Sequence, residues 1–207
     1  MSAATLRILG KASSINVRKV MWTCEEIGRP FVLEEPDLDA MQFRALNPNG
    51  LMPVIADGDF VLWESNTIIR YLVNDASAVN LLPQEPRTRA LVEKWIDWQA
   101  TEFNTAWRYA FQALVRKSAT HQNKADIETS IQDWSKAVAI VDGQVSRSGG
   151  FIAGAAFTLA DIPMGLSINR WFMTPIQDRP SFPAVSDYYD RLSERPSFMR
   201  HGRNGIP

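Results

Sequence analysis

The sequence predicts an α/β unit of about 80 residues followed by an all-helical unit. Two short apolar runs, 6–9 and 31–34, flank a segment with helical spacing, which is the order of a parallel βαβ motif. The turn Asp57-Gly58-Asp59 then joins two further strand-like runs as a hairpin. Beyond residue 86 the apolar spacing is helical throughout.

The first helix is predicted over 16–27, where apolar residues recur at helical spacing and Gly28 follows. Cys24 lies on this apolar stripe, so we expect a buried core residue rather than a reactive thiol. A short helix is expected over 39–46, capped by Asp39 and stopped by Pro48.

Strands are predicted over 53–56 and 60–63, and the next helix begins at Ser65. Residues 82–86 read as a linker. The sequence therefore predicts two domains, residues 1–80 and residues 87–207. The second domain is predicted to contain one long helix and three others, over 87–117, 127–145, 158–173 and 182–195.

Composition excludes several classes of function. The formal net charge of -1 gives no overall attraction to nucleic acid or to an anionic membrane. No apolar run approaches the ~20 residues that cross a bilayer, and residues 1–5 show no secretory pattern. We therefore expect a soluble cytoplasmic protein.

A single cysteine excludes an intrachain disulfide and a cysteine-rich metal site. The two histidines, His121 and His201, lie far apart in the sequence. We expect no metal.

Pro53 stands where a strand should begin, which has two interpretations. A proline is tolerated there because no ladder donor is needed. Alternatively, a cis Met52-Pro53 bond would turn the backbone N–H and C=O of Met52 outward, where an extended peptide could pair with them.

The pair Glu64-Ser65 stands where a helix should begin. Ser65 can be a simple N-cap, and Glu64 a solvated acid near the helix dipole. The functional alternative is that the free N–H groups bind a carboxylate while Glu64 pairs with an ammonium. A γ-linked glutamyl residue presents both groups.

The segment Ser13-Ser14-Ile15-Asn16 opens the first helix. Ser14 or Asn16 can act as an N-cap. Alternatively, a hydroxyl at the positive end of this helix can donate a hydrogen bond to a bound thiolate, and such sites lower a thiol pKa from about 8.5 by about one to several units.

These motifs resemble the cytosolic glutathione S-transferases of the bacterial type related to the theta and beta classes. The resemblance covers nearly the whole chain. The matching segments are 14–20, Asn47-Pro48-Asn49-Gly50, Met52-Pro53, Glu64-Ser65 with 68–72, and Phe157 to Asp161, where Thr158 and Asp161 match a helix capping box.

The resemblance implies a thioredoxin-like first domain with a mixed sheet, followed by an all-helical domain. It implies that glutathione is a substrate, bound by Ser13, Met52, Pro53, Glu64 and Ser65. The activating hydroxyl falls on Ser14, with Ser13 as a substitute, and Asn16 matches an asparagine that related bacterial proteins use near the sulfur. Basic residues for the glycyl carboxylate have no clear match, although Arg44 or Lys11 can compensate.

An apolar electrophile is expected in the cleft between the domains, where it would contact Trp107, Arg108, Phe111 and Trp171. Each of these residues can equally be part of the hydrophobic core. The resemblance also implies a homodimer. Two alternatives to a transferase stay open, a glutathione-dependent disulfide reductase or peroxidase and a non-catalytic glutathione-binding module.

Overall fold

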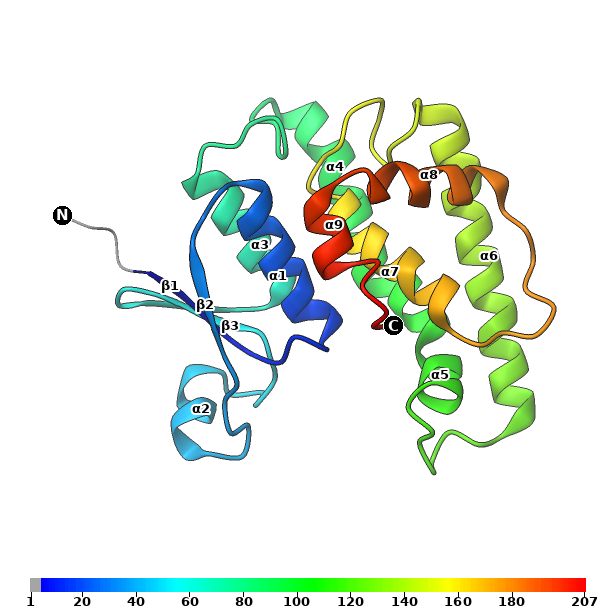
Figure 1. The fold of residues 1–207 in the computed structure, drawn as a ribbon, viewed down its shortest axis with the longest axis horizontal. Helices are drawn as coiled ribbons and strands as arrows, with labels where there is room; N and C mark the ends of the chain where they lie inside the picture. Colours follow the sequence, from blue (N-terminus) through cyan, green and yellow to red (C-terminus); the bar gives the residue numbers. More distant parts are fainter. Residues whose placement is uncertain (1–4) are drawn as a thin grey trace.

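The computed structural model describes residues 5–207, which form two lobes (Figure 1). The first lobe follows the predicted order of strands and helices. Its elements are β1 (Leu6–Leu9), α1 (Ile15–Glu26), β2 (Phe31–Glu34), α2 (Met41–Leu46), β3 (Val54–Asp57), β4 (Phe60–Trp63) and α3 (Ser65–Asp75).

The four strands form one mixed sheet in the order β2-β1-β3-β4. β1 pairs parallel with β2, as the βαβ pattern predicts, and β3 pairs antiparallel with both β1 and β4. Leu9 lies opposite Val54, and Val54 lies opposite Trp63. The last residue of β1, the first residue of β3 and the last residue of β4 therefore lie at the same end of the strands. We call this end of the strands the sheet edge.

The second lobe is helical, which confirms the predicted fold class. Its elements are α4 (Pro86–Trp98), the π-helical turn η1 (Gln99–Phe103), α5 (Asn104–Leu114), α6 (Lys124–Ser148), α7 (Asp161–Met173), α8 (Pro183–Ser193) and α9 (Pro196–His201).

The prediction of one uninterrupted helix over 87–117 is wrong. The helix widens at η1, where the buried Gln99 side chain donates to Asn104 Oδ1 (2.9 Å) and Ser167 Oγ (2.8 Å). Single π turns of this kind occur often at functional sites.

Two helix starts differ from the prediction. α2 begins at Met41 after Ala40, and Asp39 does not cap it; instead the Asp39 carboxylate lies 3.6 Å from Arg44. In the predicted capping box, Asp161 accepts from the Thr158 N–H as expected (2.8 Å), but the Thr158 hydroxyl also donates to Asp161 (3.1 Å) rather than accepting from the helix.

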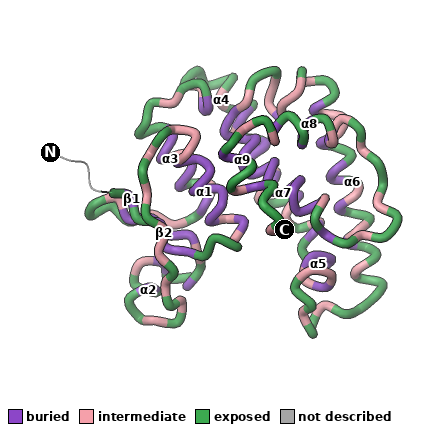
Figure 2. The backbone as a smooth tube through the Cα atoms, viewed as in Figure 1, coloured by how far each residue is buried: buried purple, intermediate pink, exposed green. Residues whose placement is uncertain are grey.

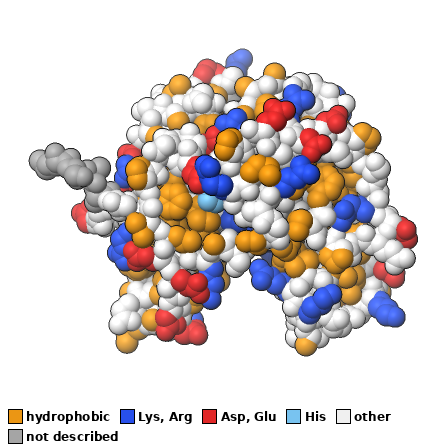
Figure 3. Space-filling view, viewed as in Figure 1, with side chains coloured by type: hydrophobic (Ala, Val, Ile, Leu, Met, Phe, Trp, Pro, Cys, Tyr) orange, Lys and Arg blue, Asp and Glu red, His pale blue; other side chains and the backbone are white. Residues whose placement is uncertain are grey.

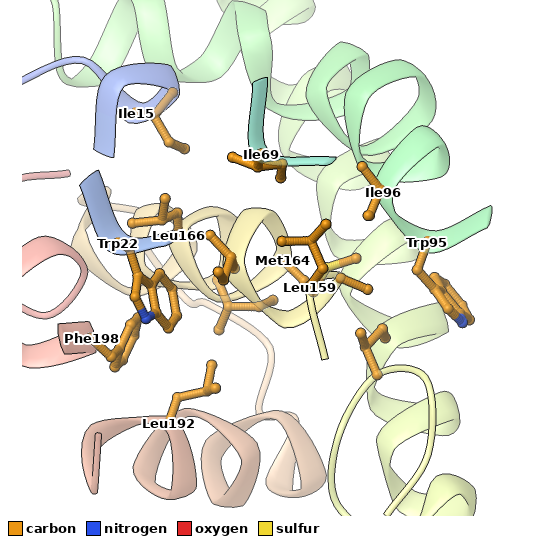
Figure 4. Packing of buried hydrophobic residues seen from close by; sticks show 14 of the residues in the cluster. Ile15, Trp22, Ile69, Trp95, Ile96, Leu159, Met164, Leu166, Leu192 and Phe198 are labelled. Atoms are coloured by element: carbon orange, nitrogen blue, oxygen red, sulfur yellow. The ribbon is translucent and has the colours of Figure 1, made fainter. Parts of the chain in front are cut away.

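α1 is the central helix of the molecule. It packs against α3 of its own lobe and against α7 and α9 of the other, and Figure 2 shows it buried along most of its length. Trp22 lies against Phe198 of α9, with ring centroids 4.9 Å apart (Figure 4). Cys24 is fully buried, and burial raises the pKa of its thiol to about 12, so it is a core residue as expected.

Two basic residues of α1 are also buried, which helical spacing alone would not predict. Arg18 donates to the carbonyl oxygens of Ile206 (2.8 Å) and Pro207 (2.9 Å). The Lys19 ammonium donates to Asn66 Oδ1 on α3 and to Gln99 Oε1 in η1, both at 3.1 Å. Lys19 therefore connects the two lobes through a buried polar junction.

Burial lowers the pKa of Lys19 to about 7, and this shift predicts a pH dependence of stability. Above pH 7 the unfolded chain, with its ordinary lysine, binds more protons than the folded chain, so stability from this group rises with pH toward 10. Between pH 7 and pH 9 the wild type should gain about 1–2 kcal/mol more unfolding free energy than Lys19→Met. Urea denaturation followed by tryptophan fluorescence measures both; equal gains would show that Lys19 keeps its ordinary pKa.

Candidate active site

Three segments converge where the chain leaves the sheet: the loop after β1, the turn before β3 and the start of α3. The loop after β1 runs close to α1 at Gly10. A Cβ atom there would lie 2.4 Å from Val17 Cγ2, so only glycine fits. The Lys11 N–H then contacts Met52 Sδ at 3.2 Å, which brings the first two segments together.

Ser14 occupies the N-cap position of α1, but its side chain makes no capping hydrogen bond. Its backbone carbonyl accepts the first helical bond, from the Arg18 N–H at 2.9 Å. Ser13 is exposed beside it, and Asn16 is half-buried. The Ser14 hydroxyl is thus free, at the positive end of a 12-residue helix.

The turn before β3 is shaped by Asn47, which is buried. Its Nδ2 donates to the Leu51 carbonyl (2.7 Å), and its Oδ1 accepts from the Asn49 N–H (3.0 Å). The Met52-Pro53 bond that follows is cis. Within residues 5–207, no protein group bonds to the Met52 backbone N–H or C=O.

Glu64, not Ser65, is the N-cap residue of α3, and its side chain makes no capping bond. It is exposed and has φ 72°, a left-handed conformation that is uncommon outside glycine. Ser65 is the first helical residue and is largely buried. Since helix starts leave N–H groups unpaired, this end of α3 offers donors beside a free carboxylate.

A cleft of about 330 Å³ lies between the two lobes. The first lobe contributes Ser13, Ser14 and Met52, all of which the sequence had identified, together with Lys11 and Ile15. Figure 3 shows a notch between the lobes with Lys and Arg side chains on both of its walls.

The second lobe contributes two predicted aromatic residues to this cleft, Trp107 and Phe111 of α5. The other two predicted electrophile-site residues lie elsewhere. Arg108 is exposed and does not line the cleft. Trp171 is only 1% exposed and packs edge-on against Trp134 at 5.1 Å, so it belongs to the core of the helical lobe.

Pro53, Glu64, Ser65 and Asn16 do not line this cleft either. The strand register nevertheless places Pro53 and Glu64 at the sheet edge that carries Met52, because Val54 pairs with Trp63. The site therefore has two parts, a cleft between the lobes and an adjoining edge of the first lobe.

Sequence reasoning missed the cationic wall of the cleft, which consists of Arg116 and Arg170 with the neighbouring Gln112. The Arg170 guanidinium stacks over Phe111 at 3.8 Å and over Trp107 at 4.4 Å. Burial, together with the charges of Arg18 and Arg116, lowers the pKa of Arg170 to about 9, so it stays charged at neutral pH. The sequence signal that could have revealed this wall is Arg170, a charged residue inside the otherwise mostly apolar helix α7.

No group of three or more His, Cys, Asp or Glu side chains in the described part of the chain is arranged to hold a metal ion. His121 bonds Ser118 Oγ (2.8 Å), and His201 bonds Glu25 (2.7 Å). None of the helices in residues 5–207 combines the length and apolar character needed to cross a membrane.

Comparison with known proteins identifies the family. Residues 9–80 match the glutathione S-transferase N-terminal domain, and residues 103–196 match the glutathione S-transferase C-terminal domain. Glutathione S-transferase GstB of Escherichia coli is 32% identical over 206 residues, covering 94% of this chain and 96% of the relative. Glutathione S-transferase 3 of Zea mays is 30% identical, covering 95% and 93%.

Among solved structures, the theta class glutathione S-transferase from Xanthomonas axonopodis pv. citri with glutathione bound superposes with a TM-score of 0.89. It is 36% identical, and the match covers 95% of this chain and 96% of that one. The chain described here belongs to the glutathione S-transferase family.

Proposed function

We propose that this chain is a glutathione transferase in which Ser14 stabilises the glutathione thiolate for attack on a small electrophile in the cleft between the lobes. The observation that carries the proposal is the shared sheet edge. At this edge lie a free helix-terminal hydroxyl, the unpaired backbone N–H and C=O of Met52 and the open start of α3.

Each part of glutathione finds a matching group at this edge. The γ-glutamyl carboxylate binds the N–H groups at the start of α3 and the Ser65 hydroxyl, while its ammonium pairs with Glu64. The cysteinyl backbone pairs with Met52 as an added strand. The glycyl carboxylate then extends toward Arg44, whose guanidinium lies over Gly50.

The chemistry belongs to the bound thiol, and the protein orients and ionises it. The Ser14 hydroxyl donates to S⁻, and the unpaired N–H groups at the start of α1 add positive potential. No protein cysteine substitutes, because Cys24 is buried in the core. We place the reaction in the cytoplasm, consistent with a protein that uses free glutathione.

Replacement of Ser14 by alanine tests the activating role. Ser14→Ala should raise the pKa of the bound glutathione thiol and lower kcat at neutral pH by about ten- to a thousand-fold, as for loss of one donor to a developing anion. The thiolate absorbance of the binary complex, titrated against pH, gives the first quantity. Steady-state kinetics with 1-chloro-2,4-dinitrobenzene give the second.

Ser13→Ala is the matched control, because it removes an adjacent hydroxyl from the same cleft. It should leave the thiol pKa unchanged. If Ser13→Ala or Asn16→Ala carries the loss while Ser14→Ala is fully active, the activating role moves to that residue.

Replacements at the start of α3 test glutathione recognition. Ser65→Ala and Glu64→Gln should each weaken glutathione binding by roughly 1–3 kcal/mol, the range for an unpaired partner of a charged group. Isothermal titration calorimetry measures the Kd. Asp59→Asn removes an exposed acidic charge from the opposite edge of the sheet and should bind normally; unchanged affinity in both site variants would refute the proposed recognition.

We also propose a two-fold homodimer in which each first lobe faces the second lobe of the partner. A surface groove between the helices of the second lobe, lined in part by Trp98, Glu102 and Ile140, is available for contact, and Ile140 is 51% exposed. Sedimentation velocity at micromolar concentration should show about twice the 23.3 kDa chain mass. A fully active species at the monomer mass would exclude the dimer.

A further inference from the structure

The cationic wall of the cleft is not needed to bind glutathione in the scheme above. Three arginines act on one another there: the charges of Arg18 and Arg116 both lower the pKa of Arg170. Arg116 and Arg170 also share one aromatic ring, since both guanidinium groups lie over Phe111, at 5.6 and 3.8 Å. None of the three forms an ion pair with any Asp or Glu among residues 5–207.

The three arginines differ in their hydrogen bonds. Arg18 is held by the carbonyl oxygens of Ile206 and Pro207. Arg116 is exposed to solvent at the cleft. Arg170 is only 3% exposed, and within the described residues its guanidinium has no hydrogen-bond acceptor; its Nε is buried without a partner. Arg18 Nε is also buried without a partner, but among the three only Arg170 is buried with no acceptor for any of its guanidinium nitrogens in the described residues.

A buried cation without an anion or an acceptor is costly. Stacking on Phe111 and Trp107 offsets part of this cost, since cation–π contacts favour a guanidinium on an aromatic face. Stacking does not use the N–H donors, which lie in the plane of the guanidinium group and point away from its face. The residues that line the cleft include no Asp or Glu. An anionic ligand in the cleft would therefore supply the carboxylate partner that the lining lacks.

We propose that the cleft selects small electrophiles that carry a carboxylate beside the reacting carbon, with Arg170 and Arg116 binding the carboxylate. This inference rests on the proposed transferase function and names the class of its second substrate. The guanidinium fork matches a carboxylate bidentately. Ser14 and Met52 mark the other wall of the same cleft, so the carbon next to that carboxylate lies toward the thiolate.

A 2-halocarboxylate illustrates the balanced reaction. The glutathione sulfur attacks the carbon that carries the halogen and forms the new C–S bond. The C–halogen bond breaks, and the halide leaves with its electron pair. The thiol proton has already gone to solvent, so no oxidant, reductant or further co-reactant is required.

Iodoacetate and iodoacetamide provide a matched pair of probes, because they share the reacting carbon and the leaving group and differ in charge. Relative to the uncatalysed rates with glutathione, wild type should enhance the iodoacetate reaction more. Arg170→Met and Arg116→Gln should lower kcat/KM for iodoacetate about ten- to a hundred-fold, the range for loss of a charge-assisted hydrogen bond. Their kcat/KM for iodoacetamide should change less than threefold, roughly the effect of losing one weak contact.

Two further variants serve as controls. Arg170→Lys restores the charge without the fork and should recover part of the iodoacetate activity. Arg87→Gln removes an exposed arginine that does not line the cleft and should behave as wild type. Because Arg116 is exposed, Arg116→Gln keeps the test valid if Arg170→Met fails to fold.

Binding of the two reaction products separates this inference from the transferase proposal. Wild type should bind S-carboxymethylglutathione more tightly than S-carbamoylmethylglutathione, and Arg170→Met should lose the preference. That preference without turnover of either electrophile would support the anion site and refute the transferase function.

Three results would overturn the inference. The first is equal binding of both conjugates by the wild type. The second is an equal loss with both electrophiles in Arg170→Met and Arg116→Gln, which would make the arginines structural. The third is a raised KM for glutathione with unchanged electrophile preference, which would assign them to a carboxylate of glutathione.

Discussion

The buried amino group of Lys19 ties together the three elements that carry the site. It lies on α1, which Ser14 opens, and it donates to Asn66, which follows Ser65 at the start of α3. Its other acceptor is Gln99, whose buried side chain also binds Ser167 of α7, the helix that carries Arg170. A polar junction of this kind is favourable only when every member is bonded, so it fixes the two lobes in one relative position. The cleft between them depends on that position.

The sequence predicts the strands and helices that carry the proposed glutathione site well because their signals are local. Gly28, the Asp57-Gly58-Asp59 turn and the short apolar runs of the strands define the first lobe from neighbouring residues alone. Once the strand order is known, pairing of Leu9 with Val54 and of Val54 with Trp63 puts Ser14, Met52 and Glu64 at one edge. In the proposed site, backbone N–H groups would perform much of the recognition, and their position depends on where helices begin rather than on distant side chains.

The second lobe was predicted less well, for a physical reason. Helical spacing identifies an apolar face but does not say which partner covers it. The sequence therefore does not distinguish Trp107, which lines the cleft, from Trp171, which lies in the core. The burial of Arg18 and Lys19 depends on acceptors 47 or more residues away. The π turn at Gln99 has the same origin, because it serves a long-range hydrogen-bond network rather than a local preference.

The glutathione part of the proposed site and the cationic wall of the cleft also differ in how they stabilise an anion. In the proposed reaction, Arg170 and Arg116 would stabilise a nearby thiolate as well as a bound carboxylate, because Coulomb attraction acts on any anion in the cleft. An anionic electrophile partly neutralises these cations when it binds, and the thiolate then loses their support at the moment of reaction. In the proposed site, the Ser14 hydroxyl and the start of α1 would not suffer this loss, since their dipoles would act on the sulfur whichever electrophile is present. A thiolate held by local dipoles is therefore compatible with a cationic wall that selects the electrophile.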